Sequence, residues 1–283
     1  MTTENTPDNP TAPTQHRPKS DVPFFIGLGI LSGGYIIIIA AMLLSELTYT
    51  TPVHFFESLS SPEIRYAIKL SLITCTITTI LSLWVAVPVG YLMSRYNIWG
   101  KALLDAILDI PIVLPPLVIG LCLLILFQTP VGQFIQNHVS VTYEIPSIIL
   151  AQFMVACAFA IRTMRVTFDQ IHPRQEQVAL TLGCSRSQAF WIVVFPQAKR
   201  GLLTAATLAW ARALGEFGPI LIFSGATRMK TEVLPTTIFL ELTVGNIEAA
   251  VAVSMLMVLL AVIVLVIVRV YGTGESIGKV LRL

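Results

Sequence analysis

Six predominantly apolar stretches, each about as long as a membrane-spanning helix, constrain the fold of this chain more than any other feature. A helix needs about 20 such residues to cross the roughly 30 Å hydrocarbon layer of a bilayer. Because lipid cannot hydrogen-bond to the backbone, a chain crosses it as helices or as a closed barrel, and stretches of this length are typical of helices. The sequence therefore predicts an all-α membrane protein with six transmembrane helices. The predicted spans cover residues 24–44, 71–93, 110–127, 146–164, 202–223 and 249–268.

The amino-acid composition agrees with a membrane environment and indicates no metal site. Only 12% of the 283 residues are charged, whereas soluble domains contain about a quarter of charged residues. With 55% hydrophobic residues, the chain would expose large apolar patches in water. The four cysteines and four histidines are far apart and show no metal-ligand spacing, so we expect neither a structural nor a catalytic metal.

The lysines and arginines predict how the chain is oriented, because cytoplasmic loops carry an excess of them. The flank before span one, the turn after span two, the segment after span four and the C-terminal tail are basic, whereas the other loops are acidic or balanced. We expect both termini in the cytoplasm. The predicted organisation is a disordered cytoplasmic tail (residues 1–22), a six-span domain (23–272) and a short cytoplasmic tail (273–283).

A segment between spans four and five, residues 170–198, carries the punctuation of two short helices. Pro173 suits a first helical turn, and Gly183 suits the left-handed position after a helix. Ser185 and Gln188 have capping-box spacing and predict a second helix over residues 189–194. We expect Pro196 to stop that helix before the chain enters the membrane again.

The same segment resembles the cytoplasmic loop of ATP-binding-cassette importer permeases. The pattern in that family is Glu-Ala-Ala, three residues, Gly, nine residues, Ile, any residue, Leu-Pro. Ala179, Gly183 and Pro196 match it, whereas Gln177 replaces the glutamate, with Glu176 beside it. The resemblance implies a coupling helix-turn-helix that docks on an ATPase subunit, with the alternative of an ordinary amphipathic loop. The residues it assigns to coupling are Gln177, Val178, Ala179, Gly183, Cys184, Ser185, Arg186, Ser187 and Pro196.

Further stretches resemble the molybdate, tungstate and sulfate branch of these permeases. They are ARALGEFGPILIFSG at 211–225, IPIVLPPLVIGL at 110–121 and TRMKTEVLPTTIFLEL at 227–242. The resemblance implies import of an oxyanion by alternating access, with molybdate or tungstate ahead of sulfate. The alternatives are sulfate or another small solute and, from a different class, an ion-coupled secondary carrier.

The resemblance also implies what must work with this chain. We expect a dimer of ATPase subunits, a second permease copy in a homodimer, a periplasmic or lipid-anchored binding protein, and the bilayer of a bacterial inner membrane, but no nucleic acid. The sequence contains no G-x-x-x-x-G-K-[ST] phosphate loop. We therefore expect no enzyme activity and no cofactor on this chain, with ATP and Mg²⁺ on the partner ATPase.

Span five carries two charges, and charges within a span are functional candidates. Arg212 and Glu216 are separated by four residues, which places them on one helix face. Two interpretations fit: a gate or dimer seam on the pathway, or a self-satisfied structural pair. Gly215 and Gly218 would permit close helix approach. In span three, Pro111, Pro115 and Pro116 predict a broken helix, and broken spans often line a pathway, with a packing or kink role as the alternative.

Four further charges have mainly structural interpretations. Asp105 and Asp109 lie near the cytoplasmic end of span three, where we expect them to be solvated or paired with Lys101. In an outer loop, Arg228 and Lys230 could meet an oxyanion or its binding protein, with a plain surface role as the alternative.

Overall fold

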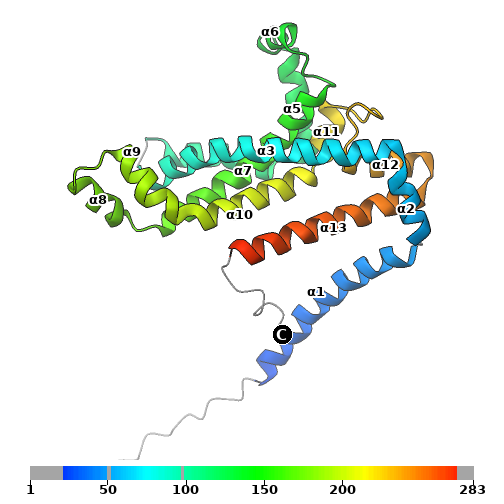
Figure 1. The fold of residues 1–283 in the computed structure, drawn as a ribbon, viewed down its shortest axis with the longest axis horizontal. Coiled ribbons are helices and arrows are strands. Elements are labelled where there is room, and N and C mark those ends of the chain that lie inside the picture. The colour runs from blue at the N-terminus through cyan, green and yellow to red at the C-terminus, as the bar shows by residue number, and fades with distance from the viewer. Residues whose placement is uncertain (1–21, 50–51, 97–98, 273–283) are drawn as a thin grey trace, which may run out of the picture. The chain divides into compact units, whose positions relative to one another are not determined.

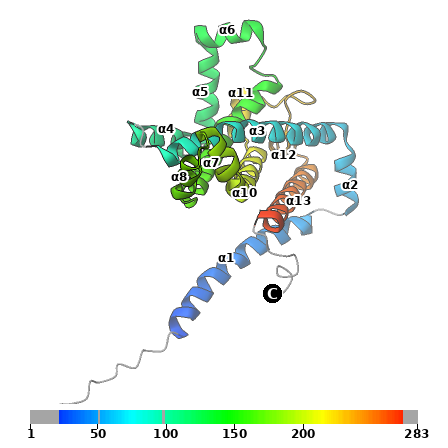
Figure 2. The same cartoon turned by 60° about the vertical axis from the view of Figure 1, so that its left-hand side comes forward.

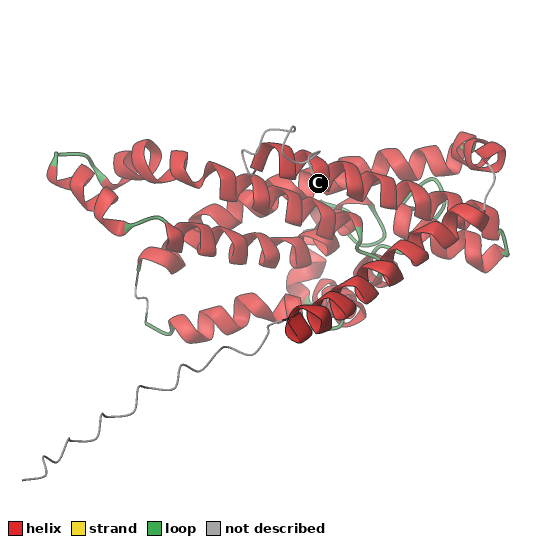
Figure 3. Ribbon diagram, turned by 90° about the horizontal axis from the view of Figure 1, so that it is seen from below, coloured by secondary structure: helices red, strands yellow, loops and turns green. Residues whose placement is uncertain are grey.

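The structure is a computed structural model in which residues 22–49, 52–96 and 99–272 are described. Every regular element in these residues is helical (Figure 3). The predicted tails lie almost entirely outside the described residues. By its internal contacts the chain divides into one unit of residues 1–48 and a second unit of residues 49–283, and each is described by itself.

The first unit contains helix α1, Val22–Tyr49. Its apolar stretch Phe24–Glu46 has 23 residues and a mean hydropathy of 2.2, which is sufficient to span a membrane. The structure thus confirms a long apolar helix where the sequence predicts span one.

Three long helices form the core of the second unit, and they lie side by side in Figures 1 and 2. They are α3 (Pro62–Arg95), α7 (Ile145–Gln170) and α10 (Phe195–Leu214). Their contact surfaces consist largely of small residues at helical spacing, which allow backbones to approach closely where lipid removes the hydrophobic drive between helices. The buried small residues include Ala67, Ser71, Cys75, Ala86, Ala156, Ala160, Ala205, Ala209 and Ala213.

Span three is broken, as predicted, at Pro115–Pro116, but not at Pro111, which lies inside a helix. It consists of α4 (Lys101–Val113) and α5 (Pro116–Gln128), bent by 109°, and Figure 2 shows α5 turning away from α4. The cause is the Pro115–Pro116 pair, because each proline excludes the helical conformation from the residue before it. Leu114 (φ −64°, ψ 140°) and Pro115 (φ −55°, ψ 134°) are accordingly extended.

The predicted fifth span is also divided. Helix α10 ends at Leu214, residues 215–217 are not helical, and α11 (Gly218–Phe223) follows. Outside the segment 170–198, the remaining helices are α2 (Pro52–Ser60), α6 (Pro130–His138), α12 (Leu234–Val244) and α13 (Ile247–Gly272), and α13 packs on α2, α10 and α12. That segment holds α8 (Pro173–Thr181), α9 (Arg186–Ala189) and the π-helix η1 (Phe190–Val194).

The number of spans therefore differs from a simple count of apolar stretches. Among the described residues, α1, α3, α7 and α13 are long and apolar enough to cross a membrane, and the bent α4–α5 pair makes up to five. Helix α10 has sufficient length but contains Lys199, Arg200 and Arg212. Six spans remain a prediction.

Candidate functional site

The segment 170–198 forms the predicted pair of short helices, and it agrees with the prediction as far as the start of the second helix. Helix α8 covers Pro173–Thr181, and Gly183 follows with φ +91°. Gly183 N donates to Leu180 O (3.0 Å) and Cys184 N to Ala179 O (3.1 Å), the two bonds of a Schellman motif. Helix α9 (Arg186–Ala189) begins with the predicted capping box between Ser185 and Gln188.

Pro196 does not stop the second helix, contrary to the prediction. From α9 the chain continues through a π-helical turn, η1 (Phe190–Val194), directly into α10. Proline has no N–H and its ring clashes with the carbonyl four residues earlier. The π turn relieves both problems because Phe195 N donates to Phe190 O, one residue beyond the usual α-helical partner. The helix pair is therefore continuous with a core helix.

A polar contact ties α8 to the end of α3. Glu176 accepts hydrogen bonds from Tyr91 Oη (2.5 Å) and Arg95 Nε (3.3 Å), and Arg95 Nη2 donates to Ile171 O (2.8 Å). The Arg95 and Glu176 side chains are only 9% and 12% exposed. The Tyr91 ring also packs against Phe190, with the ring centroids 4.8 Å apart. Sequence reasoning noted Glu176 but did not find its partners, which lie 81 and 85 residues away.

The outer surface of the helix pair is exposed. Of the residues assigned to coupling, Ala179 is buried and Cys184 is half-buried, whereas the others lie at the surface. Leu182, which the sequence analysis did not single out, is 80% exposed at the turn between α8 and α9. Its position directly before Gly183, the glycine that ends α8, was the sequence feature that could have indicated this exposed turn.

The predicted pair in span five forms at the end of α10. Arg212 Nη2 lies 2.6 Å from Glu216 Oε1, and the Glu216 side chain is only 1% exposed. The Arg212 guanidinium also lies over the Phe159 ring, 5.8 Å from its centroid. The i,i+4 pairing is thus confirmed, although Glu216 lies just beyond α10 in the break before α11.

A buried glutamine that sequence reasoning missed holds this break to the core. Gln152 of α7 is 1% exposed. Its Nε2 donates to Ala213 O (3.2 Å), and its Oε1 accepts from Thr78 Oγ1 of α3 (3.1 Å). One amide therefore joins α3, α7 and the last turn of α10. The sequence feature that could have indicated this role was a single glutamine within an apolar span.

Helices α5 and α11 approach closely at two glycines. A Cβ on Gly218 would lie 3.1 Å from Pro116 Cβ, and one on Gly120 would lie 2.8 Å from Pro219 Cα. The predicted close approach is therefore confirmed for Gly218, and the structure adds Gly120. It is wrong for Gly215, where a Cβ would meet nothing nearer than Ala211 O at 3.7 Å. The two breaks, one at Pro115–Pro116 and one before Gly218, consequently meet.

The remaining charges are paired in ways the sequence did not indicate. Asp105 of α4 bonds Arg165 of α7, and Arg162 Nη1 lies 3.9 Å from Asp109 Oδ2, so Lys101 is not the partner. These pairs join α4 to α7.

Both outer-loop cations are held by carboxylates. Arg228 Nη2 donates to Glu241 Oε1 (2.8 Å), and Lys230 Nζ lies 2.5 Å from Glu144 Oε1. The hydrogen bond that Arg228 donates to Glu241 raises the pKa of Arg228. Glu232, in the same loop, has a fully buried side chain, and burial raises its pKa although Arg228 opposes the shift. This arrangement leaves neither cation as a free anion site.

Comparison with known proteins gives a consistent result. Residues 86–273 match the family described as "Binding-protein-dependent transport system inner membrane component". The sulfate transport system permease protein CysT of Salmonella typhimurium is 31% identical over 215 residues, which cover 75% of this chain and 78% of that protein. The molybdate/tungstate transport system permease protein WtpB of Pyrococcus abyssi is 36% identical over 166 residues, covering 59% and 63%.

A solved structure shares the fold. A chain of a bacterial alginate ABC transporter, in complex with an alginate pentasaccharide-bound periplasmic protein, superposes with a TM-score of 0.74 over 90% of this chain and 96% of that one. The sequence identity is 14%, so this likeness concerns the fold alone.

Proposed function

Because the chain belongs to the family of binding-protein-dependent transport system inner membrane components, we propose that it is the permease subunit of an ATP-binding-cassette importer for an oxyanion. Its proposed partners are an ATPase dimer, a second copy of the chain and an external binding protein. The chain supplies a pathway and a mechanical link, while ATP and Mg²⁺ are bound by the ATPase. Both termini face the cytoplasm in this proposal.

The observation that carries the proposal is the capped helix pair that continues without interruption into α10. Its surface offers an exposed Leu182 at the turn between α8 and α9, which suits a docking contact. Because α9, η1 and α10 form one continuous helical path, a displacement of the pair is transmitted along α10. The tie between Glu176 and α3 makes the pair move together with a second core helix. Rigid elements of this kind convert a local rearrangement into movement of whole helices.

The proposed gate lies where α10 ends. Three contacts lie at the two helix breaks: the Arg212–Glu216 pair, the Gln152 amide and the α5–α11 contact. Unwound backbone at membrane depth is tolerated where it lines a cavity or is buried in protein. Movement of α10 would therefore reach a broken region that can change shape. This supports a role for Arg212, Gly215, Glu216, Gly218, Pro115 and Pro116 at the pathway.

The proposed cargo is molybdate or tungstate ahead of sulfate. Two relatives named for molybdate and tungstate transport are 36% and 34% identical to this chain, over 166 and 199 residues. Two named for sulfate transport are 31% and 29% identical, over the longer stretches of 215 and 246 residues. Higher identity favours the first cargo and longer coverage favours the second, so sulfate is the specific alternative.

Transport by the assembled importer tests the proposal. The chain, its ATPase and its binding protein are reconstituted in liposomes, and uptake of labelled molybdate is measured with tungstate or sulfate in competition. We expect uptake that needs ATP and both partners and that tungstate suppresses more strongly than sulfate. Uptake by the chain alone would overturn the importer assignment, and stronger suppression by sulfate would overturn the cargo.

A matched pair of variants tests the docking surface. We expect Leu182→Ser to weaken association with the ATPase, because the residue is exposed and apolar. Leu103→Ser on α4, where the side chain is 66% exposed, should leave association unchanged. Equal effects of both variants would remove the helix pair from the proposal.

A further inference from the structure

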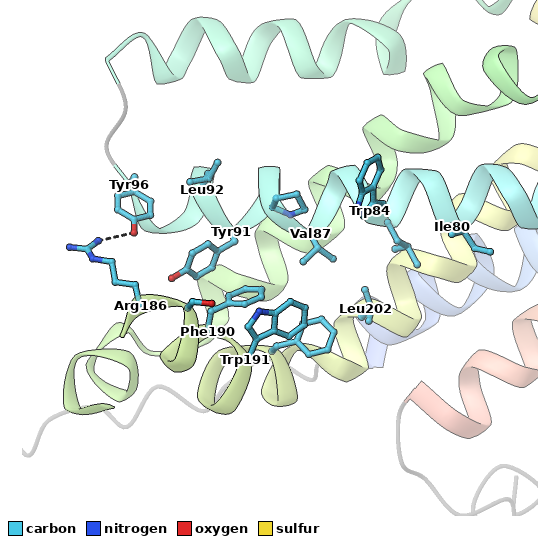
Figure 4. A pocket seen from close by; sticks show the side chains of 14 residues that line it. Ile80, Trp84, Val87, Tyr91, Leu92, Tyr96, Arg186, Phe190, Trp191 and Leu202 are labelled. Carbon is cyan, nitrogen blue, oxygen red and sulfur yellow. Dashed lines mark hydrogen bonds between the residues drawn. The ribbon is translucent and has the colours of Figure 1, made fainter. Parts of the chain in front are cut away.

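A hollow with apolar walls lies between the second half of α3 and the path formed by α9, η1 and the start of α10 (Figure 4). Its volume is 770 Å³, within the range of about 300–1,000 Å³ that ligand sites occupy. The walls are mainly aromatic and aliphatic, and they include Trp84, Leu92, Trp191 and Phe195. We call this hollow the α3–α10 groove.

The apolar side chains of the groove are exposed to a degree that a membrane environment would explain. Trp84 is 78% exposed and Trp191 is 58% exposed. Exposed tryptophans of membrane proteins are typical of the zone between hydrocarbon and headgroups, where the apolar ring is buried and its N–H can find a polar partner. The groove thus offers a surface for an acyl chain.

One end of the groove is polar and cationic. Arg186, at the start of α9, donates from Nη1 to Tyr96 Oη at 2.8 Å, and its guanidinium lies 5.8 Å from the centre of the Tyr96 ring. Among the residues that the structure describes, no carboxylate lies within ion-pair distance of Arg186. Figure 4 shows Arg186 and Tyr96 together at one end, with Trp84 and Ile80 toward the other. The remaining guanidinium donors are suited to a phosphate, which arginine binds through two parallel hydrogen bonds.

This charge pattern selects one occupant. We propose that the α3–α10 groove binds an anionic phospholipid of the cytoplasmic leaflet, with its headgroup phosphate at Arg186 and an acyl chain along Trp84 and Trp191. Anionic lipids are concentrated in that leaflet, and the cationic end lies on the helix pair that the loop charges place on the cytoplasmic side. A wholly apolar partner, such as a helix from a second copy, would offer no acceptor to the remaining Arg186 donors.

The lipid contributes contacts to both walls. It touches α3 at Trp84, and it touches the α9–η1 path at Arg186 and Trp191. It therefore bridges the core and the helix pair across the α3–α10 groove. After loss of the lipid, α3 and α8 would still be linked by the hydrogen bonds that Tyr91 and Arg95 donate to Glu176.

Lipid retention by the purified full-length chain tests the proposal. The protein in detergent is titrated with phosphatidylglycerol or phosphatidylcholine, and bound lipid is counted by native mass spectrometry. Both lipids carry a phosphate, but the choline cation of phosphatidylcholine offsets its charge beside the Arg186 guanidinium, so we expect phosphatidylglycerol to bind on the order of tenfold more tightly. Arg186→Gln should remove this preference, whereas Arg174→Gln, an exposed arginine of α8 outside the groove, should keep it. Equal retention of the two lipids, or equal effects of the two variants, would overturn the proposal.

The acyl-chain half of the groove is tested with brominated phosphatidylglycerol, which quenches nearby tryptophans. We expect Trp84→Ala to reduce both quenching and lipid retention severalfold, while Trp99→Ala, whose side chain is 99% exposed outside the groove, leaves retention unchanged. The high exposure of Trp84 means that its truncation leaves no cavity, and an unchanged unfolding temperature checks this. If Trp84 and Trp191 become inaccessible to the quencher when two copies associate, a protein partner covers the groove and the proposal is wrong.

Discussion

The contact between Glu176 and the end of α3 gives the sharpest test of how the helix pair is attached to the core. Removing the carboxylate with Glu176→Gln keeps the size of the side chain and leaves Arg95 without its ion partner. Arg95 retains the bond to Ile171 O at 2.8 Å, and the new amide oxygen can still accept from Tyr91. The variant therefore isolates the charge.

The magnitude follows from burial and from the number of bonds. A hydrogen bond to a charged group contributes about 1.5–3 kcal/mol, and removing one partner of a well-buried ion pair costs about 3–5 kcal/mol. The two side chains are mostly buried, with 9% and 12% exposure, and one hydrogen bond survives in the variant. We therefore expect Glu176→Gln to lower the free energy of unfolding by about 2 kcal/mol, and Glu176→Ala by about 3–4 kcal/mol.

Thermal unfolding of the purified full-length chain measures this loss. A loss of about 2 kcal/mol corresponds to a fall of about 4–8 °C in Tm for a domain of this size. Gln177→Ala is the matched control, because Gln177 is the neighbouring residue of α8 and its side chain is exposed. We expect the control to change Tm by no more than about 1–2 °C, as surface substitutions contribute within about 0.5 kcal/mol.

A double-mutant cycle with Arg95→Met decides whether the effect belongs to the pair. Residues in direct contact show interaction energies of about 0.5–3 kcal/mol, and we expect about 1–2 kcal/mol here. Additive losses, or a Gln177→Ala effect as large as that of Glu176→Ala, would refute the reasoning that this carboxylate holds α8 to α3.

Three further predictions concern other buried groups. Burial raises the pKa of Glu232 above its ordinary value of 4.5, so its ionised form opposes folding at neutral pH; Glu232→Gln should raise Tm at pH 7, and the gain should vanish as the pH falls toward 4.5, which melting at several pH values measures. Gly120→Ala places a Cβ 2.8 Å from Pro219 Cα and should cost about 1–3 kcal/mol, whereas Gly215→Ala should be tolerated; comparable losses in thermal unfolding would contradict the α5–α11 contact. Gln152→Leu removes the bonds to Ala213 O and Thr78 Oγ1, which keep the longer contacts to Glu216 N (3.3 Å) and Ile149 O (3.4 Å), and should cost about 1–3 kcal/mol, to be read from Tm; an unchanged Tm would show that the amide does not hold the break.

Features governed by neighbours in the sequence could be predicted from it. The end of α8 at Gly183, the Ser185–Gln188 capping box and the Arg212–Glu216 pair all depend on contacts within five residues. Helical geometry brings such residues together wherever the helix lies, so no knowledge of packing is needed. The apolar stretches likewise predicted α1, α3, α7 and α13.

One local rule gave the wrong continuation, and another gave the break without its angle. Pro196 was expected to end a helix, but a single π turn in η1 lets the helix pass it. The Pro115–Pro116 pair indicated a break, yet the sequence carried no signal for the 109° angle, which depends on how α5 packs against α11.

The sequence by itself determined that this chain builds apolar helices, where several of them are capped and which segment has two short helices. Only the tertiary structure decided the partners of the polar groups: Glu176 with Arg95, Asp105 with Arg165, and Gln152 with Ala213. Those partners are 60 to 81 residues apart along the chain. The physical reason is that a hydrogen bond or ion pair needs its two groups within about 3–4 Å, and packing of α3, α4, α7 and α10 sets that separation.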